Sequence, residues 1–261
     1  MTRIGLSTTV FGNIRPGARE LALAAAHGFS VVELAAGPGR FDVRDPGQVT
    51  EMRDAAAAAG VDIASVAVAL ADASLALHGI ADLGCPVLIA HAGGCVAHGQ
   101  TARPLPPDPG ALRRTIEHVV DHAAERQITL VVEFPAALGP DAIVDLLESL
   151  DGAPVGVCVD TGHANLAVGA PEAIDILSGY ITALHLHDNN GREDSHRPPF
   201  AGTVDWPATL MALWKMGFAG PGILELAADA DTSAVLTRAV SARTRLQAIL
   251  DDLAQPMAFP E

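Results

Sequence analysis

One unit occurs eight times along the chain: a short run of β-branched and apolar residues, then a longer run rich in Ala and Leu. The first kind of run predicts a strand. The second predicts a helix, with start signals such as Asp108-Pro109 and end signals such as Gly60. The predicted strands are 3–8, 30–34, 62–68, 86–91, 128–134, 155–160, 181–187 and 221–226, and the predicted helices are 16–27, 47–59, 72–83, 108–126, 140–150, 170–178, 206–216 and 232–254. This repeat predicts an α/β fold, a (β/α)8 TIM barrel that forms a single domain over residues 1–261.

An open, doubly wound parallel sheet is the alternative α/β architecture. Such sheets usually carry a glycine-rich first turn, whereas the first predicted strand here runs into Ser7–Gly12 without that pattern. Hydrophobic residues make up 49% of the chain, which is enough for one large core. The proline-rich stretch 103–109 is predicted to be a loop that leads into a helix.

Charge and cysteine content limit the partners and the compartment. Acidic residues outnumber basic ones 31 to 16, which gives a formal net charge of −15. Such a charge repels phosphate backbones and anionic lipids, so we expect neither a nucleic acid nor a membrane as partner. Cys85, Cys95 and Cys158 are an odd set without a C-x-x-C motif and are typical of reduced structural thiols. Because the sequence also has no long apolar segment, we expect a cytoplasmic protein.

Acidic residues and histidines collect at the carboxyl ends of the predicted strands, where a barrel places its active site. The residues at these ends are Glu33, His91, Glu133, Asp160, His185 and Glu225. Strand alternation puts Asp160 on one face with Cys158, and His185 on one face with His187. Carboxylates that converge in a barrel mouth repel one another unless something cationic lies among them.

A divalent metal ion is the simplest explanation of this convergence. We expect its ligands to be Glu133, Asp160, His185 and Glu225. Three carboxylates and one imidazole favour Mn²⁺, Mg²⁺, Co²⁺ or Zn²⁺ over soft metals, and Mn²⁺ is the first expectation. Each acidic strand end, taken alone, would equally suit a helix cap or a salt bridge. Cys158 is expected only to pack.

Segments from the fifth predicted strand onward together resemble the sugar phosphate isomerase/epimerase family, the xylose-isomerase-like barrels that include the ketose 3-epimerases and endonuclease IV. The matching segments are Val131–Glu133, Val159–Asn165, Leu184–Gly191, Asp194–Pro199 with Gly202–Trp206, and Gly220–Glu225. By position, the four expected ligands match the metal ligands of that family. His163 matches a histidine that contacts substrate oxygens in its epimerases.

The resemblance implies a small sugar or polyol as substrate and suggests which other residues serve the site. His163, His91, Arg192, His196 and Glu33 are the expected substrate-binding residues, and Asp188 and His187 are expected to orient the ligands from outside. Relatives often form dimers or tetramers, so a homodimer or homotetramer is expected. The stretch after strand 3, Ala69–Ala73, is shorter than in many relatives, so substrate size does not carry over.

The implied activity is that of a divalent-metal-dependent sugar isomerase or epimerase. A proton on the carbon beside a ketose carbonyl is too weakly acidic for a carboxylate alone, so we expect a metal-bound enediolate. Glu133 and Glu225, on opposite sides of the barrel mouth, are the expected catalytic acid/base pair. Epimerase and aldose–ketose isomerase remain alternatives, as do a keto-polyol dehydratase similar to the inosose dehydratases and a non-catalytic sugar-binding barrel.

The endonuclease branch is a further alternative within this resemblance. Residues that match its zinc ligands are His91, Glu133, Asp160, His163, His185 and Glu225. That branch also needs a histidine at the end of strand 3, where the chain has Val66–Ala69, and an Asp-x-His after strand 7, where we find the apolar Pro198–Phe200. An incomplete zinc cluster and the net charge of −15 disfavour DNA repair.

Overall fold

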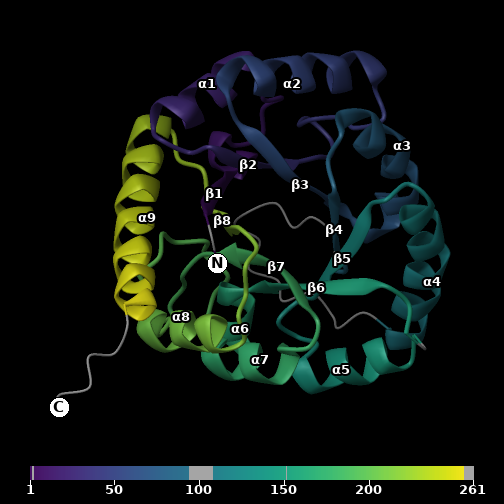
Figure 1. Ribbon diagram of the computed structural model, residues 1–261, viewed down its shortest axis with the longest axis vertical. Helices are drawn as coiled ribbons and strands as arrows, with labels where there is room; N and C mark the ends of the chain where they lie inside the picture. Colours follow the sequence, from purple (N-terminus) through teal and green to yellow (C-terminus); the bar gives the residue numbers. More distant parts are fainter. Residues whose placement is uncertain (2, 94–107, 151, 256–261) are drawn as a thin grey trace.

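The eight strands of the chain close into one parallel barrel in sequence order, with β1 paired to both β2 and β8 (Figure 1). The computed structural model describes residues 1, 3–93, 108–150 and 152–255. The strands are β1 (Ile4–Ser7), β2 (Val31–Ala35), β3 (Asp62–Ala69), β4 (Val87–His91), β5 (Thr129–Glu133), β6 (Val155–Asp160), β7 (Ile181–Leu186) and β8 (Gly222–Leu224). The predicted (β/α)8 barrel is confirmed.

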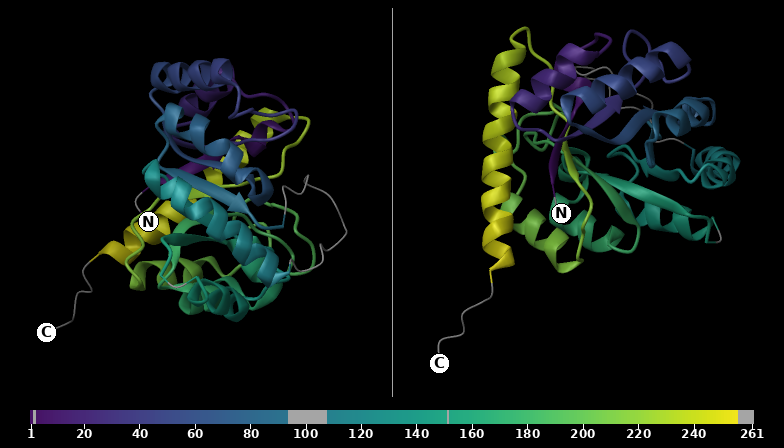
Figure 2. Two further views of the ribbon diagram at one scale, coloured as in Figure 1. Left: turned by 90° about the vertical axis from the view of Figure 1, so that its right-hand side faces the viewer. Right: turned by 45° about the horizontal axis from the view of Figure 1, so that its top comes forward.

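Helices follow the strands and form the outer layer of the barrel. They are α1 (Ala18–Ala26), α2 (Pro46–Ala59), α3 (Ala73–Leu83), α4 (Pro109–Glu125), α5 (Pro140–Glu148), α6 (Thr161–Ala167), α7 (Ala170–Leu177), α8 (Trp206–Lys215) and α9 (Thr232–Ala254), with the 3-10 helices η1 (Thr8–Phe11) and η2 (Leu70–Asp72). The start and end signals are confirmed: Asp108 accepts the N–H groups of Gly110 and Ala111 at the start of α4, and Gly60 ends α2 in the left-handed conformation. The long α9 packs beside α8 and β1 and completes the ring (Figure 2).

Three short helices, α6, η1 and η2, are present although the sequence does not predict them. α6 begins directly at the end of β6, where the Asp160 carboxylate accepts the His163 N–H at 2.8 Å and caps the helix. Strands β7 and β8 also end earlier than predicted. His187 and Glu225 therefore lie just past their strands, on backbone that leads into the loops.

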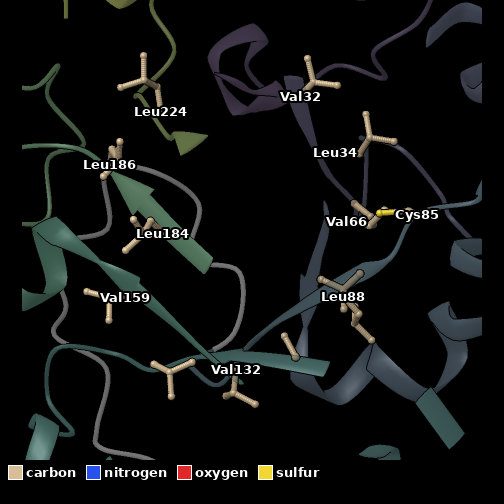
Figure 3. Close-up of a cluster of buried hydrophobic side chains, with 14 of the residues drawn as sticks. Val32, Leu34, Val66, Cys85, Leu88, Val132, Val159, Leu184, Leu186 and Leu224 are labelled. Atoms are coloured by element: carbon tan, nitrogen blue, oxygen red, sulfur yellow. The ribbon is translucent and has the colours of Figure 1, made fainter. Parts of the chain in front are cut away.

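The main core lies between the outer faces of the strands and the helix layer. Leu34, Leu88 and Leu184 belong to this core, and Figure 3 shows them distributed around the barrel. Inside the barrel lies a smaller apolar cluster made of Ala67, Ile89, Val131 and Cys158. Each of these stands two positions before the end of its strand, so the cluster forms a floor beneath the polar residues at the barrel mouth.

The described residues contain no helix that is both long and apolar enough to cross a membrane. Cys85 and Cys158 are buried free thiols, as expected for structural cysteines. Cys95 and residues 103–107 of the predicted proline-rich loop lie outside the described residues.

Candidate metal centre

The four expected metal ligands lie together at the carboxyl ends of β5 to β8. One side-chain oxygen or nitrogen from each of Glu133, Asp160, His185 and Glu225 lies within 4.8 Å of the others. Glu133 and Asp160 end their strands, His185 pairs in register with Asp160, and Glu225 directly follows β8. All four side chains are buried. Strand register, together with the backbone just past β8, therefore brings this group together.

His185 Nδ1 and Glu133 Oε2 lie close together in this group but form no hydrogen bond. His185 Nδ1 lies 2.6 Å from Glu133 Oε2 and 3.2 Å from Glu225 Oε2. Even so, no described residue supplies a hydrogen-bond partner to His185 Nδ1 or to Glu133 Oε2. Buried polar atoms almost always have a partner, so unpartnered atoms aimed at one point indicate a shared ligand. Carboxylate oxygens around an imidazole nitrogen fit a divalent cation.

Glu33 lies behind the His185 ring. His185 Nε2 donates to Glu33 Oε2 at 2.9 Å, and Ser65 Oγ donates to the same oxygen at 2.8 Å. The Glu33 and His185 side chains are fully buried. With a proton held on Nε2, the Nδ1 atom of His185 is directed at the ligand group. This geometry gives Glu33 a positioning contact with a candidate ligand, one of the two roles that its place at a strand end suits, and its contact with substrate stays a prediction.

His187 contacts the carboxylate of Asp160, and its expected role of orienting a metal ligand stays a prediction. His187 Nε2 lies 2.8 Å from Asp160 Oδ1 and 2.9 Å from Oδ2. A Cβ atom at Gly162 would overlap the His187 ring, whose Nε2 would lie only 2.7 Å away. The glycine of Thr161-Gly162-His163 therefore leaves the space through which the ring reaches Asp160.

His91 and His163 flank Glu133 at the mouth of the site. His91 Nδ1 lies 3.2 Å from Glu133 Oε2, and His163 Nδ1 lies 3.4 Å from Glu133 Oε1. Burial would raise the pKa of Glu133, but the imidazoles of His91 and His185 outweigh it and hold that pKa well below its usual value. The His91 side chain is 14% exposed and the His163 side chain is 22% exposed, so both can reach a bound molecule.

Asp194, on the loop between β7 and α8, joins the site although the sequence analysis does not single it out. Its Oδ2 lies 3.2 Å from His163 Nε2 and 3.4 Å from His196 Nε2. Burial would lower the pKa of His163, but the carboxylates of Asp160 and Asp194 outweigh burial and raise that pKa to about 10. Asp194-Ser195-His196 is itself an Asp-x-His motif. The expectation that this motif is missing after strand 7 is therefore wrong, because it stands just upstream of Pro198.

Asp188 anchors this loop. Its carboxylate accepts the N–H groups of Asn189, Phe200 and Val204 and the indole N–H of Trp206, at 2.9–3.1 Å. These contacts hold the loop, and the expected role of Asp188 in orienting a metal ligand stays a prediction. His196 adopts a left-handed φ of 43°, its Nδ1 donates to the Glu225 carbonyl oxygen at 3.0 Å, and its ring stacks on His187. Arg192 is exposed on the same loop, so its side chain is not part of the ligand group.

The family model described as "Xylose isomerase-like TIM barrel" matches residues 21–247. The chain belongs to this xylose isomerase-like family. The resemblance inferred from the sequence is thereby confirmed, and the xylose isomerase-like fold accounts for the position of the candidate metal centre at the carboxyl ends of the strands.

Solved structures share the fold, and two curated proteins match part of the sequence. A xylose isomerase-like protein from Mycobacterium smegmatis in complex with magnesium superposes with a TM-score of 0.80 at 17% identity, over 98% of both chains. D-psicose 3-epimerase with D-tagatose from Clostridium cellulolyticum H10 superposes with a TM-score of 0.78 at 16% identity, over 95% of this chain and 99% of that one. The uncharacterized protein MJ1311 of Methanocaldococcus jannaschii is 29% identical over 115 residues, which is 41% of this chain. The chain spans about two fifths of the length of the curated relatives it matches, 39% and 37%.

Proposed function

We propose that this barrel is a divalent-metal-dependent sugar isomerase or epimerase that moves a proton at the carbon beside a ketose carbonyl. The observation that carries the proposal is the pair of buried carboxylates, Glu133 and Glu225, that flank the same nitrogen of His185 at 2.6 and 3.2 Å. The pair stands at the mouth of a barrel whose structural neighbours include D-psicose 3-epimerase and L-ribulose 3-epimerase. A small sugar or polyol is the substrate class that this likeness favours.

The residues that would hold the metal ion are Glu133, Asp160, His185 and Glu225. When bound, a divalent ion supplies Lewis-acid stabilisation of the negative charge that develops on the carbonyl oxygen of the substrate. A set of three oxygen ligands and one nitrogen ligand favours Mn²⁺ or Mg²⁺, with Co²⁺ and Zn²⁺ as alternatives. Magnesium in the related Mycobacterium smegmatis barrel supports an oxygen-preferring ion.

Proton transfer falls to the two glutamates. Burial raises the pKa of Glu225, but His185 and His196 outweigh it and lower the pKa to about 2. The pKa of Glu133 is likewise depressed, so both side chains are carboxylates at neutral pH and each can accept a proton. One glutamate removes the proton, and the other, after it takes up a proton from solvent, delivers that proton to the opposite face of the carbon. The product is an epimer, and the first glutamate releases its proton to solvent. If a single glutamate serves both carbon atoms, the product is an aldose–ketose isomer.

A keto-polyol dehydratase is the second candidate. It would begin with the same proton removal and then need an acid to protonate the departing hydroxyl group. His163 and His196 lie at the site with pKa values raised by Asp194 and neighbouring carboxylates, against burial, to about 10 and about 9. Both are therefore cationic at neutral pH and could donate that proton.

The Asp194-Ser195-His196 motif brings the site closer to the endonuclease pattern than the sequence analysis allows. The end of β3 still lacks the histidine of that branch, because Ala69 is the residue in register with His91. The net charge of −15 also repels a phosphate backbone. We expect no cleavage of DNA that carries an abasic site, and this reaction serves as a counter-screen.

Deuterium exchange tests the proposal. The Mn²⁺- or Mg²⁺-loaded protein is incubated in D₂O with free and phosphorylated ketoses and an inosose, beside the Glu225→Gln variant. We expect NMR to show deuterium at the carbon beside the carbonyl with the parent protein only, and the new sugar identifies the reaction. Loss of water from the inosose would instead assign the dehydratase. Absence of exchange with the whole panel would count against proton transfer as the function.

A further inference from the structure

Cys158 lies at the floor of the candidate metal centre. It pairs in register with Glu133 across β5 and β6, and its side chain belongs to the apolar cluster inside the barrel. The Cys158 sulfur, an oxygen of Glu133 and a nitrogen of His185 all lie within 4.8 Å of one another. A soft ligand atom thus borders a set that is otherwise made of oxygen and nitrogen. The packing role expected for Cys158 does not account for a sulfur atom so close to two candidate metal ligands.

Glu133 and His185 also offer atoms that need a partner. In the described part of the chain, Glu133 Oε2 and His185 Nδ1 are buried without a hydrogen-bond partner, and the two side chains are only 4% and 0% exposed. An ion above these atoms meets the oxygens of Asp160 and Glu225, whereas an ion that shifts toward the floor meets the thiol. Ions such as Mn²⁺ and Mg²⁺ prefer the oxygens, and thiophilic ions prefer sulfur with imidazole.

We propose that Cys158, Glu133 and His185 form a second, overlapping site for a thiophilic divalent ion, with Cd²⁺ as its probe. On binding, the S–H bond breaks, the proton leaves to solvent, and the sulfur donates its electron pair to the ion without any change of oxidation state. Two ligands are shared with the oxygen-rich set, so the two ions compete. Because Glu133 then binds the thiophilic ion together with Cys158, it cannot accept a proton from the substrate, and the ion inhibits the proposed reaction. This inhibition rests on the proposed metal centre and adds a mode of regulation to it.

Cadmium binding to the metal-free protein tests the overlapping site. The parent for this experiment is the full chain with Cys95→Ser, so that Cys95 contributes no signal. We expect Cd²⁺ to produce an ultraviolet thiolate-to-cadmium charge-transfer band that saturates at one equivalent. The band should be lost in both Cys158→Ala and Cys158→Ser and retained in Cys85→Ser, whose buried thiol contacts the Val87 carbonyl oxygen instead. The second Cys158 variant covers the case in which one of the two fails to fold.

Competition with Mn²⁺ completes the experiment. Followed by electron paramagnetic resonance, Cd²⁺ should release bound Mn²⁺ from the parent, and Cys158→Ala should make this release at least about tenfold less sensitive to Cd²⁺. Survival of the band in the Cys158 variants, or Cd²⁺ binding without a band, would overturn the overlapping site. Neither result would bear on deuterium exchange by the Mn²⁺ form, which tests the sugar chemistry separately. Conversely, a Cys158-dependent band in a protein that exchanges no deuterium would refute the sugar chemistry alone.

Discussion

Replacement of Gly162 by alanine tests whether the contact between His187 and Asp160 organises the metal centre. Gly162 is the second residue of α6, and an added methyl group would overlap the His187 ring, with even Nε2 at only 2.7 Å. The ring is fully buried and stacks on His196 with 3.8 Å between centroids, so it has little room to retreat. The added methyl group should therefore displace His187 from Asp160, which it contacts at 2.8 Å.

The size of the effect follows from three terms. Loss of a hydrogen bond to a charged group costs about 1.5–3 kcal/mol. An extra methyl group in a packed interior costs about 1–3 kcal/mol. Alanine in a helix is about 1 kcal/mol more favourable than glycine. We therefore expect the free energy of unfolding of Gly162→Ala to fall by about 1.5–5 kcal/mol. The affinity for Mn²⁺ should fall by about 10–100-fold, as is typical when a ligand loses its outer partner.

Urea unfolding of the metal-free protein measures the first quantity, and titration with Mn²⁺ followed by electron paramagnetic resonance measures the second. Gly179→Ala is the matched control, because Gly179 is exposed and an added Cβ there would meet nothing within 4 Å. If Gly162→Ala matched this control in both measurements, His187 would not be required to orient Asp160, and the reasoning would fail.

Three further substitutions probe the surroundings of the metal centre. Glu33→Gln should lower Mn²⁺ affinity by about tenfold, because the charge behind His185 is lost; unchanged affinity with a raised KM would instead make Glu33 a substrate contact. Asp188→Asn places an amide where four N–H groups converge, so we expect the free energy of unfolding to fall by about 2 kcal/mol and limited proteolysis to cut faster within residues 189–205. Asp194→Asn should flatten the pH dependence of stability. The pKa of His196 is raised from 6.5 to about 9, so its contribution is complete below pH 6.5 and disappears as the pH rises through about 9. Urea unfolding of metal-free protein between these values should show that decline in the parent, and an equal decline in Asp194→Asn would contradict the role of the aspartate.

The ligand group could be predicted because it depends on periodicity. Once the repeat identifies a parallel barrel, the last inward residue of each strand must reach the same end, and the register between β6 and β7 then pairs Asp160 with His185. The contact between Glu33 and His185 could not be obtained this way. β2 and β7 are not neighbours in the barrel, so their side chains meet across its interior, where the distance depends on how the closed barrel packs.

The loop after β7 escaped prediction for a different reason. Its path depends on hydrogen bonds from residues far along the loop to Asp188, and on positive φ angles at His196 and Phe200. A positive φ is uncommon for every residue except glycine, even for histidine, which adopts it more often than phenylalanine. Neither residue type therefore signals such a backbone in a sequence. Asp194 therefore reaches His163 only because distant contacts fold the loop back over the barrel mouth.

The arrangement of charge explains how so many buried carboxylates coexist in this site. Glu33 and Glu133 face His185, and Asp160 faces His187. Each pairing offsets the burial of a negative charge, which would otherwise be costly. The pairing is also asymmetric at His185. Glu33 holds the proton on the outer nitrogen, Nε2, while Nδ1 faces the carboxylates of Glu133 and Glu225 without a hydrogen-bond partner in the described part of the chain. A cation that binds at Nδ1 therefore also offsets the negative charge of these two carboxylates, and burial strengthens that attraction.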